Sequence, residues 1–281
     1  MEDLFKCLLQ AIFETATIDP KWLKFGGGEN AALLDAVRTV WKYIGFFGMA
    51  LTLIYFLIEI NSKLALEGAQ NMTLKSFMAP FLKLVIACSI LHNAGHIVGA
   101  LLSVNDAMVD KAKTVFTGST TVTDTDGDGI SDENQEVFDN MNDVFKDFNL
   151  VEKCLVVIVT ILVWIVSLVL QVVWIYKAMT YKLEVLWRTA ITPTAFADVY
   201  SGTHSNMLRW MKGFIGLTLY AMAIIVLPQM AMLLSIGGSI GSLTNADIWM
   251  LLRALVTSII APFAALGVMS TIKQMCKEAL G

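Results

Sequence analysis

The sequence predicts an all-α membrane protein that crosses the bilayer about five times, and three observations carry this prediction. First, the chain of 281 residues is 56% hydrophobic and only 16% charged, and its mean hydropathy is +0.66. A soluble globular chain has about 25% charged residues, so the composition favours the membrane class. Second, five stretches are long and apolar enough to span a bilayer. Third, the acidic residues are concentrated between two of these stretches.

The predicted spans follow from the length that a helix needs to cross lipid. About 20 predominantly apolar residues cover the hydrocarbon core, and each span has to be helical because lipid offers no partner for backbone polar groups. The stretches that satisfy this condition are 40–60, 77–104, 154–176, 213–236 and 248–272. The third contains no charged residue, whereas the first carries Lys42 and Glu59 near its ends.

Four segments follow from these spans. Leu4, Leu8 and Ile12 recur at helical spacing, which predicts an amphipathic helix lying on a membrane surface or on a neighbouring subunit. The predicted segments are 1–38 (N-terminal, amphipathic and external), 39–104 (two spans with an amphipathic connector), 105–150 (an external acidic loop) and 151–281 (three spans with a basic cytoplasmic loop at 177–212).

Charge predicts the orientation. The segment 177–212 holds five basic residues against Glu184 and Asp198. Basic residues in loops favour the cytoplasmic side of a membrane. We therefore expect the N-terminus outside and the C-terminus inside.

The acidic loop contains a calcium-like motif. Asp124, Asp126 and Asp128 alternate, and Gly129 follows where a calcium-binding loop turns sharply. The predicted oxygen ligands are Asp124, Asp126, Asp128, Ile130 through its carbonyl, Asp132 and Glu136. Position twelve, where a bidentate glutamate is expected, is Gln135, so Glu136 comes one place late. The loop is thus predicted to bind calcium, and the alternative is a solvated acidic linker.

Polar residues interrupt the second predicted span at His92, Asn93 and His96. Residues four apart share a helix face. Polar groups at membrane depth face a bundle interior or a water-filled path. These side chains are therefore candidates for lining a pore or for hydrogen bonding between helices. A position near the outer interface, where water is close, is the third alternative.

No enzymatic activity is predicted, because the sequence contains no P-loop, no GxSxG and no HExxH motif. The segment between the third and fourth spans is more distinctive. It contains, in order, Trp187-Arg188, a short helix broken by Pro193, the pair Ala197-Asp198, a Gly/Ser-rich turn, and Arg209-Trp210-Met211-Lys212 before a long span. This segment resembles the TrbL-like conjugal transfer proteins, the polytopic inner-membrane channel component of type IV secretion systems, in versions from Gram-positive conjugative elements.

The resemblance implies a channel subunit in the bacterial cytoplasmic membrane that helps translocate single-stranded DNA and protein. Its implied partners are other secretion-system membrane subunits, the ATPases, DNA with its attached relaxase, and further copies in a homo-oligomeric ring, with a pentamer as the candidate stoichiometry. Arg188, Arg209 and Lys212 are placed to contact phosphate at a cytoplasmic mouth, or lipid headgroups. The alternatives are a small-molecule or ion transporter or channel, and a holin-like structural membrane protein.

Overall fold

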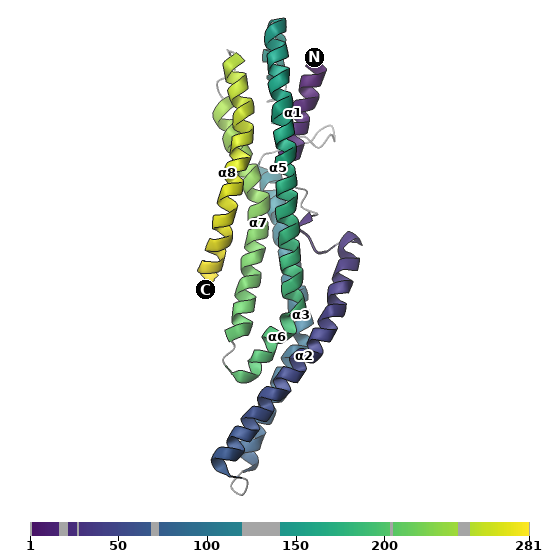
Figure 1. The fold of residues 1–281 in the computed structure, drawn as a ribbon, viewed down its shortest axis with the longest axis vertical. Coiled ribbons are helices and arrows are strands. Elements are labelled where there is room, and N and C mark those ends of the chain that lie inside the picture. Colours follow the sequence, from purple (N-terminus) through teal and green to yellow (C-terminus); the bar gives the residue numbers. More distant parts are fainter. Residues whose placement is uncertain are drawn as a thin grey trace. The chain divides into compact units, whose positions relative to one another are not determined.

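A computed structural model describes residues 2–16, 22–26, 28–68, 73–119, 141–202, 205–240 and 248–280. Throughout these residues the regular structure is helical, which confirms the all-α prediction (Figure 1). The helices, in chain order, are α1 (Glu2–Ala16), α2 (Gly28–Glu67), α3 (Leu74–Ser119), α5 (Leu150–Ala190), α6 (Thr192–Ala197), the 3-10 helix η2 (Asp198–Ser201), α7 (Ser205–Ile240) and α8 (Ile248–Leu280).

Five of these helices are long and apolar enough to cross a membrane, as predicted. The apolar segments are Leu33–Leu66, Ser76–Ala112, Leu150–Ala190, Ser205–Pro228 and Ile248–Met275. The chain therefore fits a multi-pass membrane protein. The helices extend beyond the predicted spans, because helix-compatible polar residues at their ends continue the backbone hydrogen bonding.

Among the described residues, two segments predicted as connections are helical in part. The acidic loop was predicted at 105–150, but α3 continues to Ser119 and residues 141–146 are again helical. The connector between the first two spans is also short. Helix α2 runs to Glu67, and Gly68 ends it with φ 72° and an N–H that donates to the Leu64 carbonyl at 3.0 Å. This left-handed ending is typical of a glycine that follows a helix.

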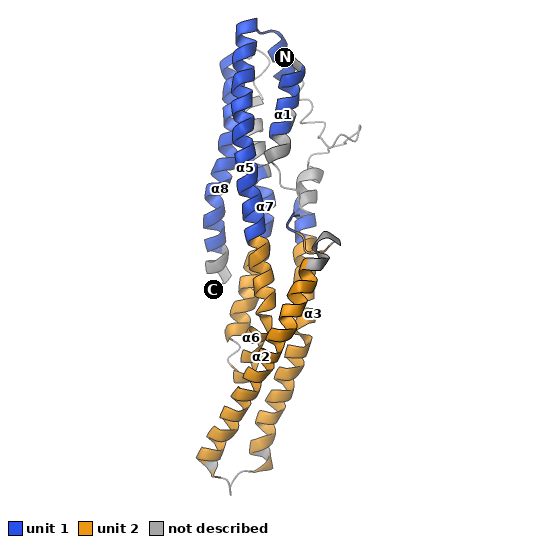
Figure 2. Ribbon diagram, turned by 45° about the vertical axis from the view of Figure 1, so that its right-hand side comes forward, with its two compact units in different colours: residues 1–23, 108–180, 219–275 blue, residues 24–107, 181–218, 276–281 orange. Residues whose placement is uncertain are grey.

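The chain divides into two compact units (Figure 2). The first comprises residues 1–23, 108–180 and 219–275. Its core includes Phe5, Leu9 and Ile12 from α1, and the Phe5 ring stacks on Phe145 with centroids 4.4 Å apart. The predicted helical spacing in α1 is thus present. The side chains of α1 that lie in this core are Phe5, Leu9 and Ile12. Of the predicted residues, Ile12 is therefore in the core, whereas Leu4 and Leu8 are not.

The second unit comprises residues 24–107, 181–218 and 276–281 (Figure 2). In it, α2 and α3 run side by side and antiparallel, and α6 packs on α2. The buried Tyr181 hydroxyl donates to Asn105 Oδ1 at 2.7 Å, which joins α5 to α3. The backbone N–H of Phe25 donates to the Asp106 carboxylate at 2.9 Å, which fixes the chain before α2. All the polar sites described next lie in this unit.

Candidate functional site

The connection between α5 and α7 is a short broken helix, which we call the α6 segment (residues 187–202). Helix α5 ends at Ala190, and Pro193 then occupies the first turn of α6, where its missing N–H and fixed φ are tolerated. The 3-10 helix η2 follows directly. Gly202 ends it with φ 77°, in the left-handed region that glycine adopts easily.

A glycine in α2 lets the α6 segment approach closely. A Cβ atom on Gly48 would lie 2.7 Å from the Pro193 carbonyl oxygen and 3.1 Å from the Pro193 Cβ. Gly45, one turn earlier in α2, has no atom within 4 Å of the equivalent position. Gly48 lies in the middle of the first predicted span. The α6 segment therefore packs at the level of the apolar part of α2, although it was predicted to belong to a cytoplasmic loop.

Most of the α6 segment is buried. The buried residues are Thr189, Ala190, Thr192, Pro193, Phe196, Ala197, Asp198, Val199 and Tyr200. Phe196 meets the Trp210 ring edge to face at 5.5 Å. The Trp210 Nε1–H donates to the Arg188 carbonyl at 2.9 Å, so the first turns of α7 are tied to the last turn of α5. Irregular backbone of this kind occurs at membrane depth only where protein buries it or where it lines water.

Asp198 supplies the cap of α7. Its side chain is 8% exposed. The carboxylate accepts hydrogen bonds from Ser201 Oγ at 2.9 Å and from the Asn206 backbone N–H at 3.0 Å. An acidic group at a helix N-terminus satisfies free N–H groups and interacts favourably with the helix dipole. From the sequence, Asp198 was an acid in a basic loop and a member of the Ala197-Asp198 pair, and neither pattern predicted a helix cap.

The three predicted phosphate or headgroup contacts separate into two kinds. Arg188 is partly buried, and its Nη2 lies 3.5 Å from Glu184 Oε1. Its guanidinium occupies the space that a side chain at Gly213 would need. Arg209 and Lys212, in contrast, are exposed near the start of α7. Arg188 therefore interacts with residues of its own unit, whereas the side chains of Arg209 and Lys212 lie at the surface.

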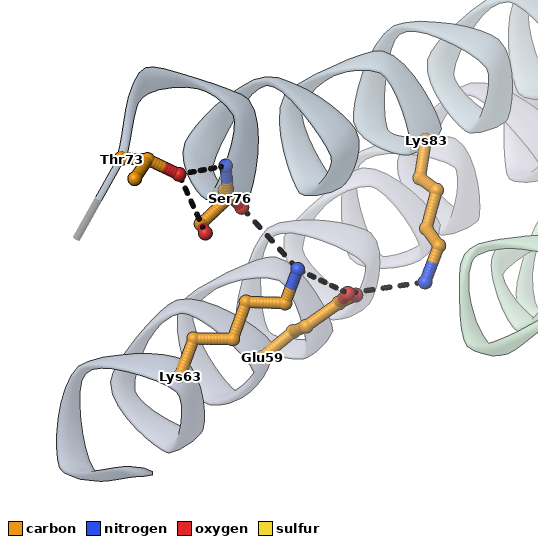
Figure 3. Close-up of polar contacts among 5 residues, drawn as sticks. All are labelled: Glu59, Lys63, Thr73, Ser76 and Lys83. Carbon is orange, nitrogen blue, oxygen red and sulfur yellow. Dashed lines mark hydrogen bonds and ion pairs between the residues drawn. The ribbon is translucent and has the colours of Figure 1, made fainter. Parts of the chain in front are cut away.

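A charged cluster joins α2 to α3 near their connection (Figure 3). The Lys83 Nζ donates to Glu59 Oε1 at 3.0 Å, and Lys63 Nζ lies 3.9 Å from the same oxygen. Lys63 also donates to the Ser76 carbonyl at 3.2 Å. In the sequence, Glu59 lies near the end of the first predicted span and Lys83 lies near the start of the second. The two residues lie a similar number of positions from the connection between α2 and α3, and this spacing in the sequence could have predicted their pairing.

A buried tyrosine hydroxyl lies beside this cluster. The side chain of Tyr200 is 3% exposed, and its ring packs edge to face on Phe56 at 6.3 Å. The hydroxyl has no hydrogen-bond partner among the described residues. Burial raises the pKa of Tyr200, and the Glu59 carboxylate raises it further without meeting hydrogen-bond geometry. The hydroxyl is thus a buried donor held near an acid.

His92, Asn93 and His96 lie on α3, and all three side chains are exposed. Asn93 Nδ2 donates to the Ser89 carbonyl of its own helix at 2.9 Å. Nothing in the described part of the chain gives either histidine a hydrogen bond or an ion pair. Among the described residues, these three side chains form no hydrogen bond to another helix.

The predicted calcium ligands Asp124, Asp126, Asp128, Ile130, Asp132 and Glu136 lie outside the described residues. Among the residues that are described, no three histidine, cysteine, aspartate or glutamate side chains gather closely enough to hold a metal ion. The calcium site stays a prediction from the sequence.

Comparisons with known proteins give no match to a family model, to a curated protein or to a solved structure. The function is therefore inferred from the fold, from the α6 segment and from the resemblance carried by residues 187–212.

Proposed function

We propose that this chain is a membrane subunit of a translocation channel in a conjugative type IV secretion system. In this proposal it assembles as a homo-oligomeric ring in the cytoplasmic membrane. It works with the other membrane subunits and the ATPases of the system. The cargo is single-stranded DNA with its attached relaxase, together with protein.

The observation that carries the proposal is the contact between Gly48 and Pro193. It supports a position for the α6 segment beside the apolar part of a long helix, with buried polar groups such as Asp198 and the Tyr200 hydroxyl. Broken helices with polar groups at membrane depth are typical of proteins that move polar cargo. The same segment carries the resemblance to the TrbL-like proteins.

The exposed cations support a role at the cytoplasmic side. Arg209 and Lys212 lie on the first turns of α7 and are exposed. In the proposed orientation, with the N-terminus outside and the C-terminus inside, α7 begins at its cytoplasmic end, so these cations would lie in a water-filled entrance that opens to the cytoplasm. Cations there attract a phosphate backbone without reading its sequence. The acidic loop then lies outside the cell, where calcium would order it.

A deletion strain tests the proposal directly. The gene is removed cleanly from a donor strain, and DNA transfer to a recipient is measured with donor growth held equal. Loss of transfer, restored by the wild-type gene supplied in trans, is the expected result. Undiminished transfer from the deletion strain would exclude the proposed function.

A small-molecule or ion transporter is the second candidate, because the broken α6 segment is also typical of transporters. Under that function, the deletion would change uptake or resistance while leaving DNA transfer intact. The same strain therefore separates the two functions.

A further inference from the structure

One face of α3 changes in character along its length. Its exposed residues near the connection with α2 are large and apolar, as at Met78, Leu82 and Val85. Further along the same face the exposed residues are polar or small. We call this part the α3 polar face, and it consists of Ser89, His92, Asn93, His96, Gly99 and Ser103. Their spacing of three or four residues keeps them on one side of the helix.

Contacts between α2 and α3 show which residues of α2 lie beside the α3 polar face, at the same level along the two helices. At one end, Lys83 pairs with Glu59 at 3.0 Å. At the other end, a Cβ on Gly95 would lie 3.4 Å from the Trp41 ring. Ser89 and Asn93 lie between these two levels. The neighbouring part of α2 exposes large apolar side chains, and Phe47 is 59% exposed. Exposed polar side chains on α3 and exposed, strongly apolar side chains on α2 therefore occur at the same level of the two helices.

Polar and apolar side chains differ in how favourable they are in the hydrocarbon core of a membrane, and this difference limits what the α3 polar face can contact. Large apolar side chains such as Phe47 are favourable in hydrocarbon, whereas histidine and asparagine are costly there and face the interior of a bundle or water. The structure leaves His92, Asn93 and His96 exposed, so the bundle interior of their own chain does not cover them.

We propose that the α3 polar face lines a water-filled path through the assembled channel. The inference rests on the proposed channel function and identifies the surface along which the cargo moves. Between Lys83 and Asp106 the helix carries no Lys, Arg, Asp or Glu. Hydroxyl, amide and imidazole groups can replace part of the hydration of a passing polar chain without binding it tightly, as a conducting path requires.

Cysteine accessibility in native membranes tests the proposal. The full-length chain, with its four native cysteines replaced by serine, receives a single cysteine as Ser89→Cys or Asn93→Cys. The matched control is Phe47→Cys, which lies six residues from Trp41 as Ser89 lies six residues from Gly95. A charged, membrane-impermeant methanethiosulfonate is the probe, and labelling rates are measured by mass spectrometry.

The expected result is fast labelling at Ser89→Cys and Asn93→Cys, with little labelling at Phe47→Cys. Equal labelling at all three positions would overturn the proposal, because these three residues would then lie in the water of the lipid headgroup region. No labelling at either α3 position would also overturn it, because lipid or another protein surface would then cover the face.

Labelling also separates this inference from the proposed function. Selective labelling of the α3 polar face in a chain whose deletion leaves DNA transfer intact would indicate an aqueous path for another cargo. Dependence of DNA transfer on the chain, combined with an unlabelled α3 polar face, would place the path elsewhere. Where Asn93→Cys supports transfer, modification by the probe is expected to reduce transfer, and modification at Phe47→Cys is not.

Discussion

Gly48 of α2 and Pro193 of α6 are in direct contact, and the contact leaves no room for a side chain at Gly48. The added carbon of an alanine would lie 2.7 Å from a backbone oxygen, which cannot move aside as a flexible side chain can. This pair joins a long apolar helix to the broken segment between α5 and α7.

The first prediction concerns this contact. Gly48→Ala is expected to destabilise the protein by about 1–3 kcal/mol, the usual range for overpacking. Gly45→Ala, with no atom within 4 Å of the added carbon, is expected to be neutral or slightly stabilising, because alanine favours helix. Thermal unfolding of both variants in the same detergent measures the difference. A Gly48→Ala variant as stable as Gly45→Ala would contradict the packing.

The second prediction concerns the tie between α5 and α7. Trp210→Phe keeps an aromatic ring beside Phe196 but removes the donor to the Arg188 carbonyl. We expect a loss of about 0.5–1.5 kcal/mol, the typical net contribution of one hydrogen bond. Trp249→Phe is the control, because Trp249 is 77% exposed. Equal melting temperatures for the two variants would argue against the hydrogen bond.

The third prediction concerns pH. Burial raises the pKa of Tyr200, so the folded state retains this proton at a pH where the unfolded chain, with a tyrosine pKa of about 10, has lost it. This contribution to stability is complete below that pH and is lost as the pH rises above it. Tyr200→Phe is expected to weaken the alkaline loss of stability, measured as melting temperature against pH in detergent.

Tyr43→Phe is the control for this measurement, since Tyr43 is 72% exposed. Tyr200→Phe is also expected to raise stability at neutral pH, because it removes a buried hydroxyl that lacks a partner among the described residues. An alkaline profile for Tyr200→Phe that coincides with that of Tyr43→Phe would contradict the prediction.

The fourth prediction concerns the charged cluster. Glu59→Lys would place a third cation beside Lys63 and Lys83, so we expect lower stability. Adding Lys83→Glu to the same chain restores an opposite pair, and stability is expected to recover in part. The coupling between the two changes measures the interaction. For the highly exposed pair Arg38–Asp35, the same exchange is expected to give little coupling. Additive effects at Glu59 and Lys83 would exclude a direct pairing.

The fifth prediction concerns calcium. Calorimetry on the full chain in detergent is expected to detect binding with a Kd of about 0.1–1 mM, the range of extracellular modules. Asp126→Ala removes a predicted ligand and is expected to abolish the heat, whereas Asp139→Ala, outside the motif, is expected to retain it. Binding that survives Asp126→Ala would identify the loop as a general acidic segment.

Much of the fold could be predicted from the sequence because lipid constrains a span strongly. Length and hydropathy identified the five long apolar helices of the described residues, and the spacing in α1 identified its helical character. The residues at which the helices end were harder to predict from the sequence. Whether a polar stretch such as 105–119 continues a helix depends on local backbone hydrogen bonds that hydropathy does not report.

The candidate site was less predictable because it depends on contacts between distant segments. Pro193 indicated a break, but its packing on Gly48 could not be read from either position alone. The pairing of Glu59 with Lys83 depends on the register of two antiparallel helices. Conversely, His92, Asn93 and His96 were recognised as polar residues in a span, and only the structure indicated that their own chain leaves them exposed.

The position of Asp198 also limits how this end of the molecule can handle anions. Since its carboxylate already accepts the Asn206 N–H, the free amides at the start of α7 face a resident negative charge. A phosphodiester approaching from water would be repelled at the helix axis and drawn toward its flank, where Arg209 and Lys212 are exposed. This geometry favours transient contact through exposed side chains over binding in a fixed anion pocket.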